Sequence, residues 1–297
     1  MKVKVLWLVI LFFLCINDMS SEIVFRKEKS IFIKLYGGGS SGSSIFDLDE
    51  NLLTKLTDDS SKYSVKDYTI ELSKNTIGLL CEYSLFDNLI LFGNMPITFN
   101  SLEEKYIGDS IGVRYDKAKY SLTHPEYFGI GAKYEFFRRK SYGVLLIEAR
   151  IPPGFKRGML DTSKNFFLGD GAFELLSGLA FGIKTDKFLL ESMFLYNYRD
   201  EELADQFIIR IEAGICTVPN SKLSVTSDFV LSMKSFKEVI PLKTNQIVTQ
   251  EDYIAIGFEF SMFFSESIYG EFNYNIKLLG KNSWNLGIYR IGAGVLF

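Results

Sequence analysis

The chain has 297 residues and a formal net charge of −3, with 33 basic and 36 acidic side chains. This balance gives no reason to expect nucleic acid as a partner. Aromatic residues make up 15% of the chain, with 27 Phe and 16 Tyr but only 6 Pro. Such a composition favours many long β-strands over a Pro-rich or helical chain.

The first residues resemble an export signal in their order of charge and polarity. Met1–Lys4 is basic, Val5–Ile16 is continuously apolar, and polar residues follow. The apolar run is shorter than the ~18 residues that a membrane helix needs. We therefore predict a secretory signal peptide at residues 1–21, cleaved near Ser20 or Ser21, and a mature domain at residues 22–297.

Apolar or alternating runs, separated by turn residues, predict an all-β chain of twelve antiparallel strands. The predicted strands are Ile31–Gly38, Thr76–Phe86, Leu89–Phe99, Tyr127–Phe137, Tyr142–Pro152, Asp170–Ile183, Lys187–Tyr198, Asp205–Val218, Lys222–Ser235, Tyr253–Phe264, Ser267–Leu278 and Trp284–Phe297.

The connections between these strands alternate between short and long. The short ones fall on the side of the two termini, as in outer-membrane β-barrels. A soluble β-sandwich is the alternative, but its strands are shorter on average. We expect the two longest connections, Gly39–Asn75 and Asn100–Glu126, to be loops. The first begins with a glycine-serine segment that we expect to be flexible, and Ile45–Leu56 is either a solvated loop or a short amphipathic helix.

The last strand places Tyr289, Ile291, Ala293, Val295 and Phe297 on one face, and the chain stops at the aromatic residue. This pattern resembles the C-terminal insertion signal of bacterial outer-membrane β-barrels. The resemblance implies outer-membrane lipid and the barrel-assembly machinery as partners, and it implies a Gram-negative-type envelope. We therefore predict an up-and-down transmembrane β-barrel in the cell outer membrane.

No catalytic, metal or cofactor site is predicted. The single histidine, His124, lies in a predicted loop, where we expect a surface residue. No Cys, Asp or Glu cluster around it has metal-ligand spacing, and the chain contains neither a G-x-S-x-G nor a Walker A pattern. We expect Cys81 and Cys216 to be unpaired, although a bridge between them is an alternative.

Charges of both signs occur on the polar face of nearly every predicted strand. With the apolar face toward lipid, these side chains line the lumen. We predict that a charge network of Lys133, Glu135, Glu148 and Arg150, with Glu174 nearby, sets the constriction of a permeation path. The other predicted lumen-facing charges are Glu82, Glu191, Arg210, Glu212, Asp228, Glu259, Glu271, Lys277 and Arg290.

Two longer stretches carry a more specific resemblance. The sequence IGLLCEYSLFDNLILFGNMP at Ile77–Pro96 and the hairpin at Gly169–Arg199 resemble motifs of the FadL-related meta-pathway phenol-degradation transporters. The matching positions are Glu82, Tyr83, Asp87, Pro96, Gly169, Gly171, Glu174, Tyr196, Tyr198 and Arg199. The resemblance implies a barrel that takes up hydrophobic or aromatic small molecules.

The sequence thus leaves two functions of different classes. One is a porin-like channel or transporter for a small-molecule substrate. The other is a non-conducting structural or adhesion barrel that acts through its two longest outer connections. Twelve strands do not decide between them, because such a barrel is intermediate between side-chain-filled eight-stranded barrels and open sixteen-stranded porins.

Overall fold

The computed structural model of the chain describes residues 28–46, 52–53, 65–108, 116–138, 141–153, 172–200, 203–216, 221–233, 252–281 and 283–297. These ranges contain strands and no helix, so none of their segments is a helix that could cross a membrane. The strands are β1 (Ile31–Phe46), β2 (Leu52–Leu53), β3 (Val65–Phe86), β4 (Leu89–Gly108), β5 (Asp116–Pro125), β6 (Phe128–Arg138), β7 (Ser141–Ile151), β8 (Glu174–Lys184), β9 (Phe188–Arg199), β10 (Gln206–Ile215), β11 (Ser221–Ser232), β12 (Asp252–Phe263), β13 (Ile268–Lys281) and β14 (Ser283–Leu296).

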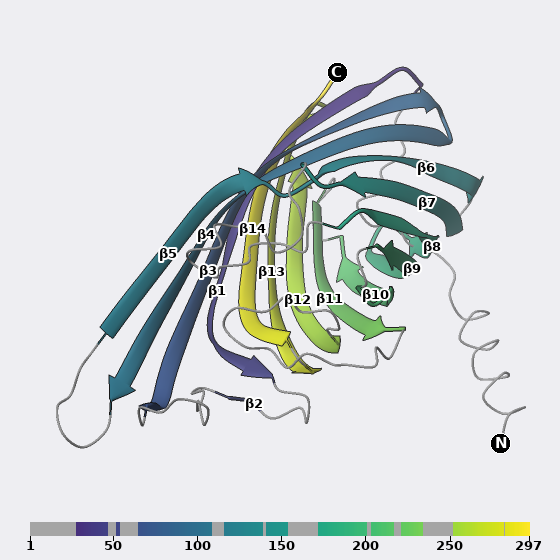
Figure 1. The fold of residues 1–297 in the computed structure, drawn as a ribbon. Coiled ribbons are helices and arrows are strands. Elements are labelled where there is room, and N and C mark those ends of the chain that lie inside the picture. The colour runs from purple at the N-terminus through teal and green to yellow at the C-terminus, as the bar shows by residue number, and fades with distance from the viewer. Residues whose placement is uncertain are drawn as a thin grey trace, which may run out of the picture.

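The strands form one antiparallel sheet that closes on itself (Figure 1). Each strand pairs with its neighbours in sequence, and β14 pairs with β1 to complete the circle. Two of the strands share one place, because β6 pairs with the first half of β4 and β5 with the second half. The short β2 pairs only with the end of β1. The result is the predicted closed barrel of twelve antiparallel strands.

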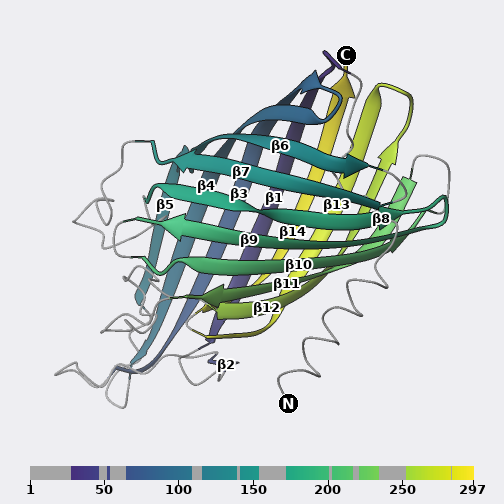
Figure 2. The same ribbon diagram turned by 90° about the vertical axis from the view of Figure 1, so that its right-hand side faces the viewer.

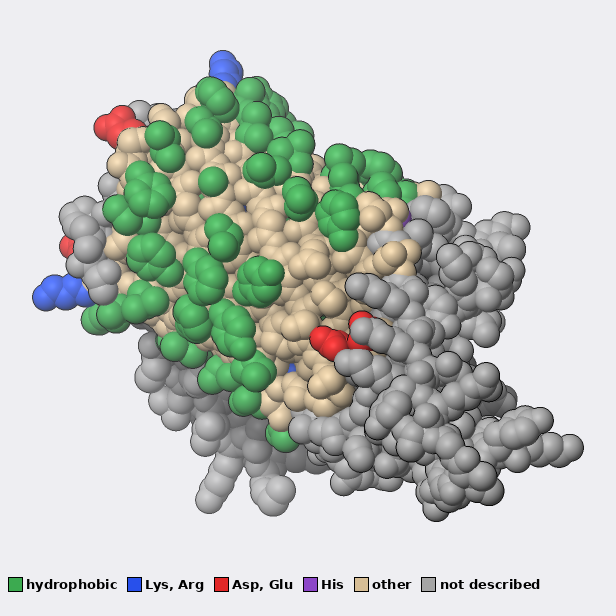
Figure 3. Space-filling model, turned by 90° about the vertical axis from the view of Figure 1, so that its left-hand side faces the viewer, with side chains coloured by type: hydrophobic (Ala, Val, Ile, Leu, Met, Phe, Trp, Pro, Cys, Tyr) green, Lys and Arg blue, Asp and Glu red, His purple; other side chains and the backbone are tan. Residues whose placement is uncertain are grey.

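The outside of the barrel is apolar over the part of each strand nearer the termini. In β7, Leu145 and Ile147 are exposed on the outside, whereas Val144 between the outer positions is fully buried. Apolar side chains cover much of the described outer face in Figure 3. A closed barrel with an apolar exterior satisfies every backbone group inside lipid. The architecture is that of an outer-membrane β-barrel, which confirms the predicted fold class and location.

The two walls of the barrel differ in the strands that form them. Strands β6 to β11 make one wall, and β1, β3, β4, β13 and β14 make the opposite one (Figure 2). The described short turns lie on the side of the termini, and Asp87-Asn88 forms the tight turn predicted between β3 and β4. This arrangement fixes which residues share the interior.

The prediction of loops at Gly39–Asn75 and Asn100–Glu126 is wrong for most of their described residues. The glycine-serine segment continues β1 to Phe46, β3 begins at Val65, and β4 and β5 occupy most of the second connection. These extensions form a sheet that projects beyond the rest of the barrel (Figures 1 and 2). The connection between the last two predicted strands, Leu279–Ser283, belongs to the longer, outer-side set, and its described residues are likewise strand.

The exterior of the projecting sheet explains the error. On the exterior of β3, the exposed residues Ile77 and Leu79 are apolar, whereas the exposed residues farther out, Asn75 and Glu71, are polar. The lipid-facing part of β3 is therefore close to the ~9–11 residues that cross a bilayer, and beyond it the apolar alternation stops. The glycine-serine strand holds its shape because it pairs on both sides, with β14 and with β3. Pairing here overrides the low strand propensity of glycine.

Two further predictions fall partly or wholly outside the described residues, and a third, on the cysteines, falls within them. The signal peptide at residues 1–21 lies outside them, so it stays a prediction. Of the alternative helix at Ile45–Leu56, the described parts are strands, since Ile45 and Phe46 pair with Leu53 and Leu52. Cys81 and Cys216 are both free, as predicted.

The exposed C-terminal residue, Phe297, allows a test of the predicted insertion signal. Phe297 donates its backbone N–H to the carbonyl oxygen of Ile31 at 2.8 Å and accepts the N–H of Ile31 at 3.1 Å. Its side chain is 71% exposed and contributes little to packing. We expect Phe297→Asp to lower the outer-membrane level of the protein while the thermal stability of the purified barrel stays unchanged. Phe264→Asp, which alters an exposed aromatic in a turn, is the matched control.

Fractionation and quantitative blotting measure the first effect, and heat-modified mobility on gels measures the second. Wild-type membrane levels for Phe297→Asp would show that the terminal aromatic residue is not an insertion signal.

Candidate permeation path

The structure places most of the predicted lumen charges on the interior-facing side of the strands. The buried ones are Glu82, Glu135, Glu148, Glu191, Glu212, Glu259, Glu271 and Lys277. The half-buried ones are Lys133, Arg150, Glu174, Arg210 and Asp228, and Arg290 is exposed. By contrast, Tyr289, Ile291, Ala293, Val295 and Phe297 of the predicted insertion signal are all exposed on the outside.

One ion-pair network lies at the outer end of β7, β8 and β9. The Nη2 atom of Arg150 lies 3.1 Å from Glu148, and its Nη1 atom lies 3.2 Å from Glu174. Arg199 reaches Glu174 at 3.4 Å. Two guanidinium groups and two carboxylates therefore alternate across three strands, so that the network has no net charge.

The network continues through aromatic side chains on the neighbouring strands. The guanidinium of Arg150 stacks over the ring of Tyr127, 4.9 Å from its centroid. Asn94 donates a hydrogen bond to Tyr127 Oη at 3.2 Å, and it accepts one from Tyr36 at 2.8 Å. On the other side of Tyr36, Arg290 stacks over its ring at 5.3 Å.

These side chains form a continuous polar row from β14, across β1, β4 and the residue that precedes β6, to β7, β8 and β9. We call this row the tyrosine–arginine belt. It consists of Arg290, Tyr36, Asn94, Tyr127, Arg150, Glu148, Glu174 and Arg199.

The predicted network of Lys133, Glu135, Glu148 and Arg150 does not form as a single cluster. Lys133 pairs with Glu82 at 2.8 Å, and Glu135 lies 3.7 Å from Arg138. The strand register is the reason. Lys133 lies opposite Leu146, whereas Glu148 lies opposite Gly131, two positions farther along the strand. Of the predicted partners, only Glu148, Arg150 and Glu174 meet.

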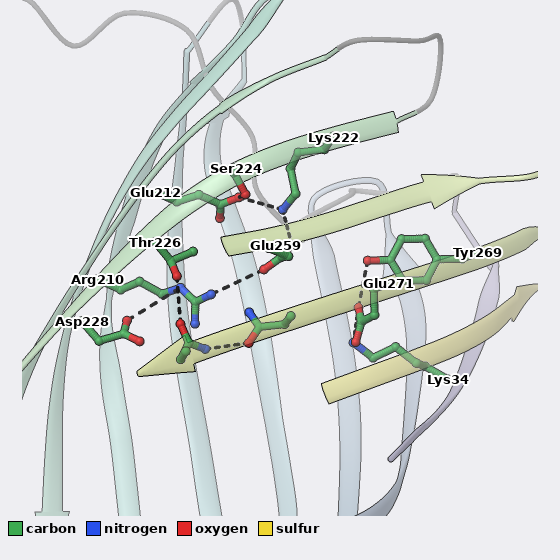
Figure 4. Close-up of polar contacts among 12 residues, drawn as sticks. Lys34, Arg210, Glu212, Lys222, Ser224, Thr226, Asp228, Glu259, Tyr269 and Glu271 are labelled. Atoms are coloured by element: carbon green, nitrogen blue, oxygen red, sulfur yellow. Dashed lines mark hydrogen bonds and ion pairs between the residues drawn. The ribbon is translucent and has the colours of Figure 1, made fainter. Parts of the chain in front are cut away.

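A second network lies on β10, β11 and β12 (Figure 4). Lys222 binds Glu212 at 2.8 Å and Glu259 at 2.5 Å. Arg210 lies 3.5 Å from Glu259 and 3.9 Å from Asp228. Removing one partner of such a buried pair typically costs about 3–5 kcal/mol, because the other charge stays desolvated. The network therefore holds this wall in one arrangement.

Glycines on the interior face let side chains reach over a neighbouring strand. Asn275 of β13 lies against Gly257 of β12, so that it accepts a hydrogen bond at 3.1 Å from Thr226 of β11. Glu271 likewise lies against Gly292 of β14 and binds Lys34 of β1 at 3.0 Å. A side chain at either glycine position would fill the space that these contacts use.

Tyr36 in the belt also reaches over a glycine of the neighbouring strand. Its ring lies against Gly78 of β3, which is its direct cross-strand partner. With no Cβ in the way, the Tyr36 hydroxyl reaches Asn94 on β4. The belt thus depends on a glycine that contributes no polar atom to it.

The interior also carries an apolar surface below the belt, on the side of the termini. Phe92, Leu146, Met193 and Leu195 are half-buried on the interior-facing positions of β4, β7 and β9. Buried apolar side chains on β4, β7, β8 and β9 complete the surface. They are Ile90, Val144, Ala180 and Leu189. The interior is therefore divided into an apolar surface and a charged one.

Sequence reasoning missed several of these residues. Lys34 alternates with the exposed Ile33 and Leu35, so its parity alone would have placed it inside. Lys222 is the first residue of its predicted strand, where parity is a weak guide to the interior. Tyr36 and Tyr127 carried no signal, because a tyrosine fits the lipid girdle of a barrel as well as its interior.

His124 also differs from its prediction as a surface loop residue. It lies on β5 and is only 8% exposed. Its Nε2 atom lies 3.3 Å from the hydroxyl of Thr98. The pairing of β5 with β4 buries it.

Among solved structures, one similar chain is the COG4313 outer membrane channel from Pseudomonas putida F1. The two chains superpose with a TM-score of 0.63 at 11% identity, over 94% of this chain and 100% of that chain. At this identity the likeness shows the fold alone. The TodX monoaromatic hydrocarbon channel and a Pseudomonas aeruginosa FadL homologue also match, with 9% identity each and TM-scores of 0.44 and 0.39. The alignments cover 94% of this chain and 92% of TodX, and 91% and 90% for the FadL homologue. These two scores are too low to support an argument. No protein-family model and no curated protein matched the sequence.

The glycine contacts generate a test of the belt. A valine at Gly78 would collide with the ring of Tyr36, and overpacking of this kind costs about 1–3 kcal/mol. We expect Gly78→Val to lower the melting temperature of the purified barrel and to separate Tyr36 from Asn94. Gly93→Val is the control, because a Cβ at Gly93 meets only a backbone oxygen at 3.8 Å. Equal melting temperatures for the two variants would contradict this role of Gly78.

Proposed function

We propose that this protein is an outer-membrane channel for small hydrophobic or aromatic molecules. The observation that carries the proposal is the apolar interior surface around Leu146, Met193 and Leu195. The interior of a barrel built only for water and ions has no need of it, since porin interiors are polar. An apolar solute could leave the water of the outer side and move along this surface.

The tyrosine–arginine belt lies where such a solute enters the apolar surface. In the strand register, Glu148 of the belt faces Leu176, and the next interior row below it contains Leu146. In the belt, Arg150 and Arg199 are balanced by Glu148 and Glu174, so an uncharged solute that passes these four residues meets no excess charge. An ion, however, must pass close to charges that are only partly screened in a narrow interior. We propose that the belt is the constriction and governs ion flow.

The sequence resemblance supports the finer part of the proposal. The FadL-related meta-pathway phenol-degradation group is matched at Glu82, Tyr83 and Asp87 in the first hairpin and at Glu174 and Arg199 in the second. Two of these residues, Glu174 and Arg199, belong to the belt. The solved COG4313 channel supports a channel rather than an enzyme through its fold.

An adhesion surface is the second candidate, and the projecting sheet is the observation that favours it. This sheet contains the parts of β3, β4 and β5 that extend beyond the lipid-facing exterior. Shortening β3 and β4 by matched deletions at their outer ends distinguishes the two functions. Conductance that survives these deletions favours a channel, whereas a silent barrel that loses binding to a surface partner favours adhesion.

Replacing Arg150 tests the constriction. In Arg150→Ala, Glu148 loses its cation and Glu174 keeps only Arg199. The added negative charge should increase selectivity for cations, measured as the zero-current potential across a planar bilayer in a KCl gradient. Arg138→Ala is the control, because it removes the same charge from a side chain that is 56% exposed near a turn.

Uptake of N-phenyl-1-naphthylamine, an uncharged aromatic, should stay near the wild-type rate in cells that express Arg150→Ala. If neither conductance nor zero-current potential changes, the belt only packs the wall and does not form the constriction.

Replacing Leu146 tests the apolar surface. Leu146→Gln keeps a similar volume but adds an amide to the half-buried interior surface. We expect slower uptake of N-phenyl-1-naphthylamine, by severalfold, with little change in KCl conductance. Leu146→Met is the control, because it preserves volume and polarity. Wild-type uptake by Leu146→Gln would argue against passage of apolar solutes along this surface.

A further inference from the structure

Asn100 is a buried polar side chain whose amide nitrogen is unpaired. It lies on β4 and is 4% exposed. The amide nitrogen, Nδ2, is buried and makes no hydrogen bond with any residue in the described part of the chain. An unpaired buried donor is destabilising, and natural structures contain few of them. A ligand that accepts a hydrogen bond would remove this cost.

The residues beside Asn100 form a polar cluster at the outer end of the interior. In the strand register, Asn100 pairs with Lys74 of β3, and Thr98 on the next interior position pairs with His124 of β5. Lys74 reaches over β4 and binds Glu126 at 2.5 Å. Thr98 is fully buried. We call this group of Lys74, Thr98, Asn100, His124 and Glu126 the mouth cluster.

The other polar groups of the mouth cluster already have partners. His124 Nδ1 lies 2.7 Å from the carbonyl oxygen of Pro125, which can only accept, so Nδ1 carries the proton. In the neutral ring, Nε2 is then an acceptor for the hydroxyl of Thr98. Lys74 and Glu126 neutralise each other. The donor of the mouth cluster that is both buried and unpaired among the described residues is the amide of Asn100.

The charge of the mouth cluster restricts the class of ligand. Its one cation is paired with a carboxylate, so an incoming anion would meet Glu126 as well as Lys74. An uncharged oxygen meets no such repulsion and can accept the N–H of Asn100. The side chains of Lys74 and Glu126 are 34% and 31% exposed, so this pair is the part of the mouth cluster that a solute meets first.

We propose that the mouth cluster binds the oxygen of an uncharged carbonyl-bearing or hydroxyl-bearing molecule through Asn100. This inference rests on the proposed function, because it assigns to the channel a preference among uncharged solutes. An oxygen-bearing aromatic is held at the mouth cluster before it reaches the apolar surface. A hydrocarbon of the same size has only the apolar surface to bind.

Binding to the purified barrel in lipid nanodiscs tests the proposal without requiring conductance. Benzaldehyde, toluene and benzoate serve as probes, and saturation-transfer NMR measures the binding of each. We expect Asn100→Leu to weaken benzaldehyde binding by about tenfold, the effect of one buried hydrogen bond of ~1.4 kcal/mol, and to leave toluene binding unchanged. Asn75→Leu is the control, because Asn75 is exposed on the exterior of β3.

Thermal stability supplies a second readout. The buried amide nitrogen of Asn100 has no hydrogen-bond partner among the described residues. The melting temperature of the Asn100→Leu barrel should therefore equal or exceed that of the wild type. Asn100→Asp, which presents only acceptors at its ionised carboxylate, should lose benzaldehyde binding to a similar extent. Unchanged benzaldehyde binding in both variants would overturn the proposal, as would wild-type binding of benzoate more tightly than benzaldehyde.

The outcome for toluene separates this inference from the proposed function. If toluene binds but Asn100→Leu leaves benzaldehyde binding unchanged, the proposal for the mouth cluster is wrong and the channel proposal stands. If none of the three probes binds the wild-type barrel, the proposed function itself fails.

Discussion

Backbone hydrogen bonding in lipid is the constraint on which the rest of this structure depends. A sheet edge inside the bilayer would leave N–H and C=O groups unpaired, each at a cost of several kcal/mol. The pairing of β1 with β14 removes that edge, and it extends from Phe32 opposite Leu296 to Phe46 opposite Ser283. Closure forces alternate residues into one enclosed interior. The choice of residues at those positions then determines what the protein can pass or bind.

Charges inside this enclosure are stabilised along the wall. Each of the described interior ion pairs joins residues of one strand, of adjacent strands, or of strands separated by one other. Lys34 with Glu271 and Lys133 with Glu82 show the longer spacing. Interior glycines such as Gly292 make this spacing possible, because they leave room for a side chain to reach over their strand. Pairing along the wall fixes the charges without requiring a bridge through the middle of the barrel.

The sequence was informative wherever lipid dictates the pattern. It predicted the β6–β7 and β8–β9 hairpins to within a few residues, because Leu145 and Ile147 must alternate with interior positions. It failed for the outer halves of β3 and β4 and for the whole of β5. These parts project beyond the lipid-facing exterior, so their outer face needs no apolar alternation. Their strand structure comes from pairing between distant segments, such as Leu72 with Leu102, which no local pattern reveals.

The candidate site was only partly predictable for a related reason. Parity identifies which charges enter the interior, but partners depend on register. Register separated Lys133 from Glu148 and brought Arg150 to Glu174 and Arg199. The aromatic members of the belt, Tyr36 and Tyr127, are visible only once the strands are aligned. Asn100 could be singled out only from its burial and its missing partner.

Single-channel recording of the wild-type barrel in a planar bilayer tests the central claim most directly. The account predicts stepwise conductance in KCl that toluene reduces reversibly and in proportion to its concentration, because both use the same interior. A correctly folded barrel that shows no conductance steps, and to which toluene does not bind, would contradict it and would favour a structural or adhesion role.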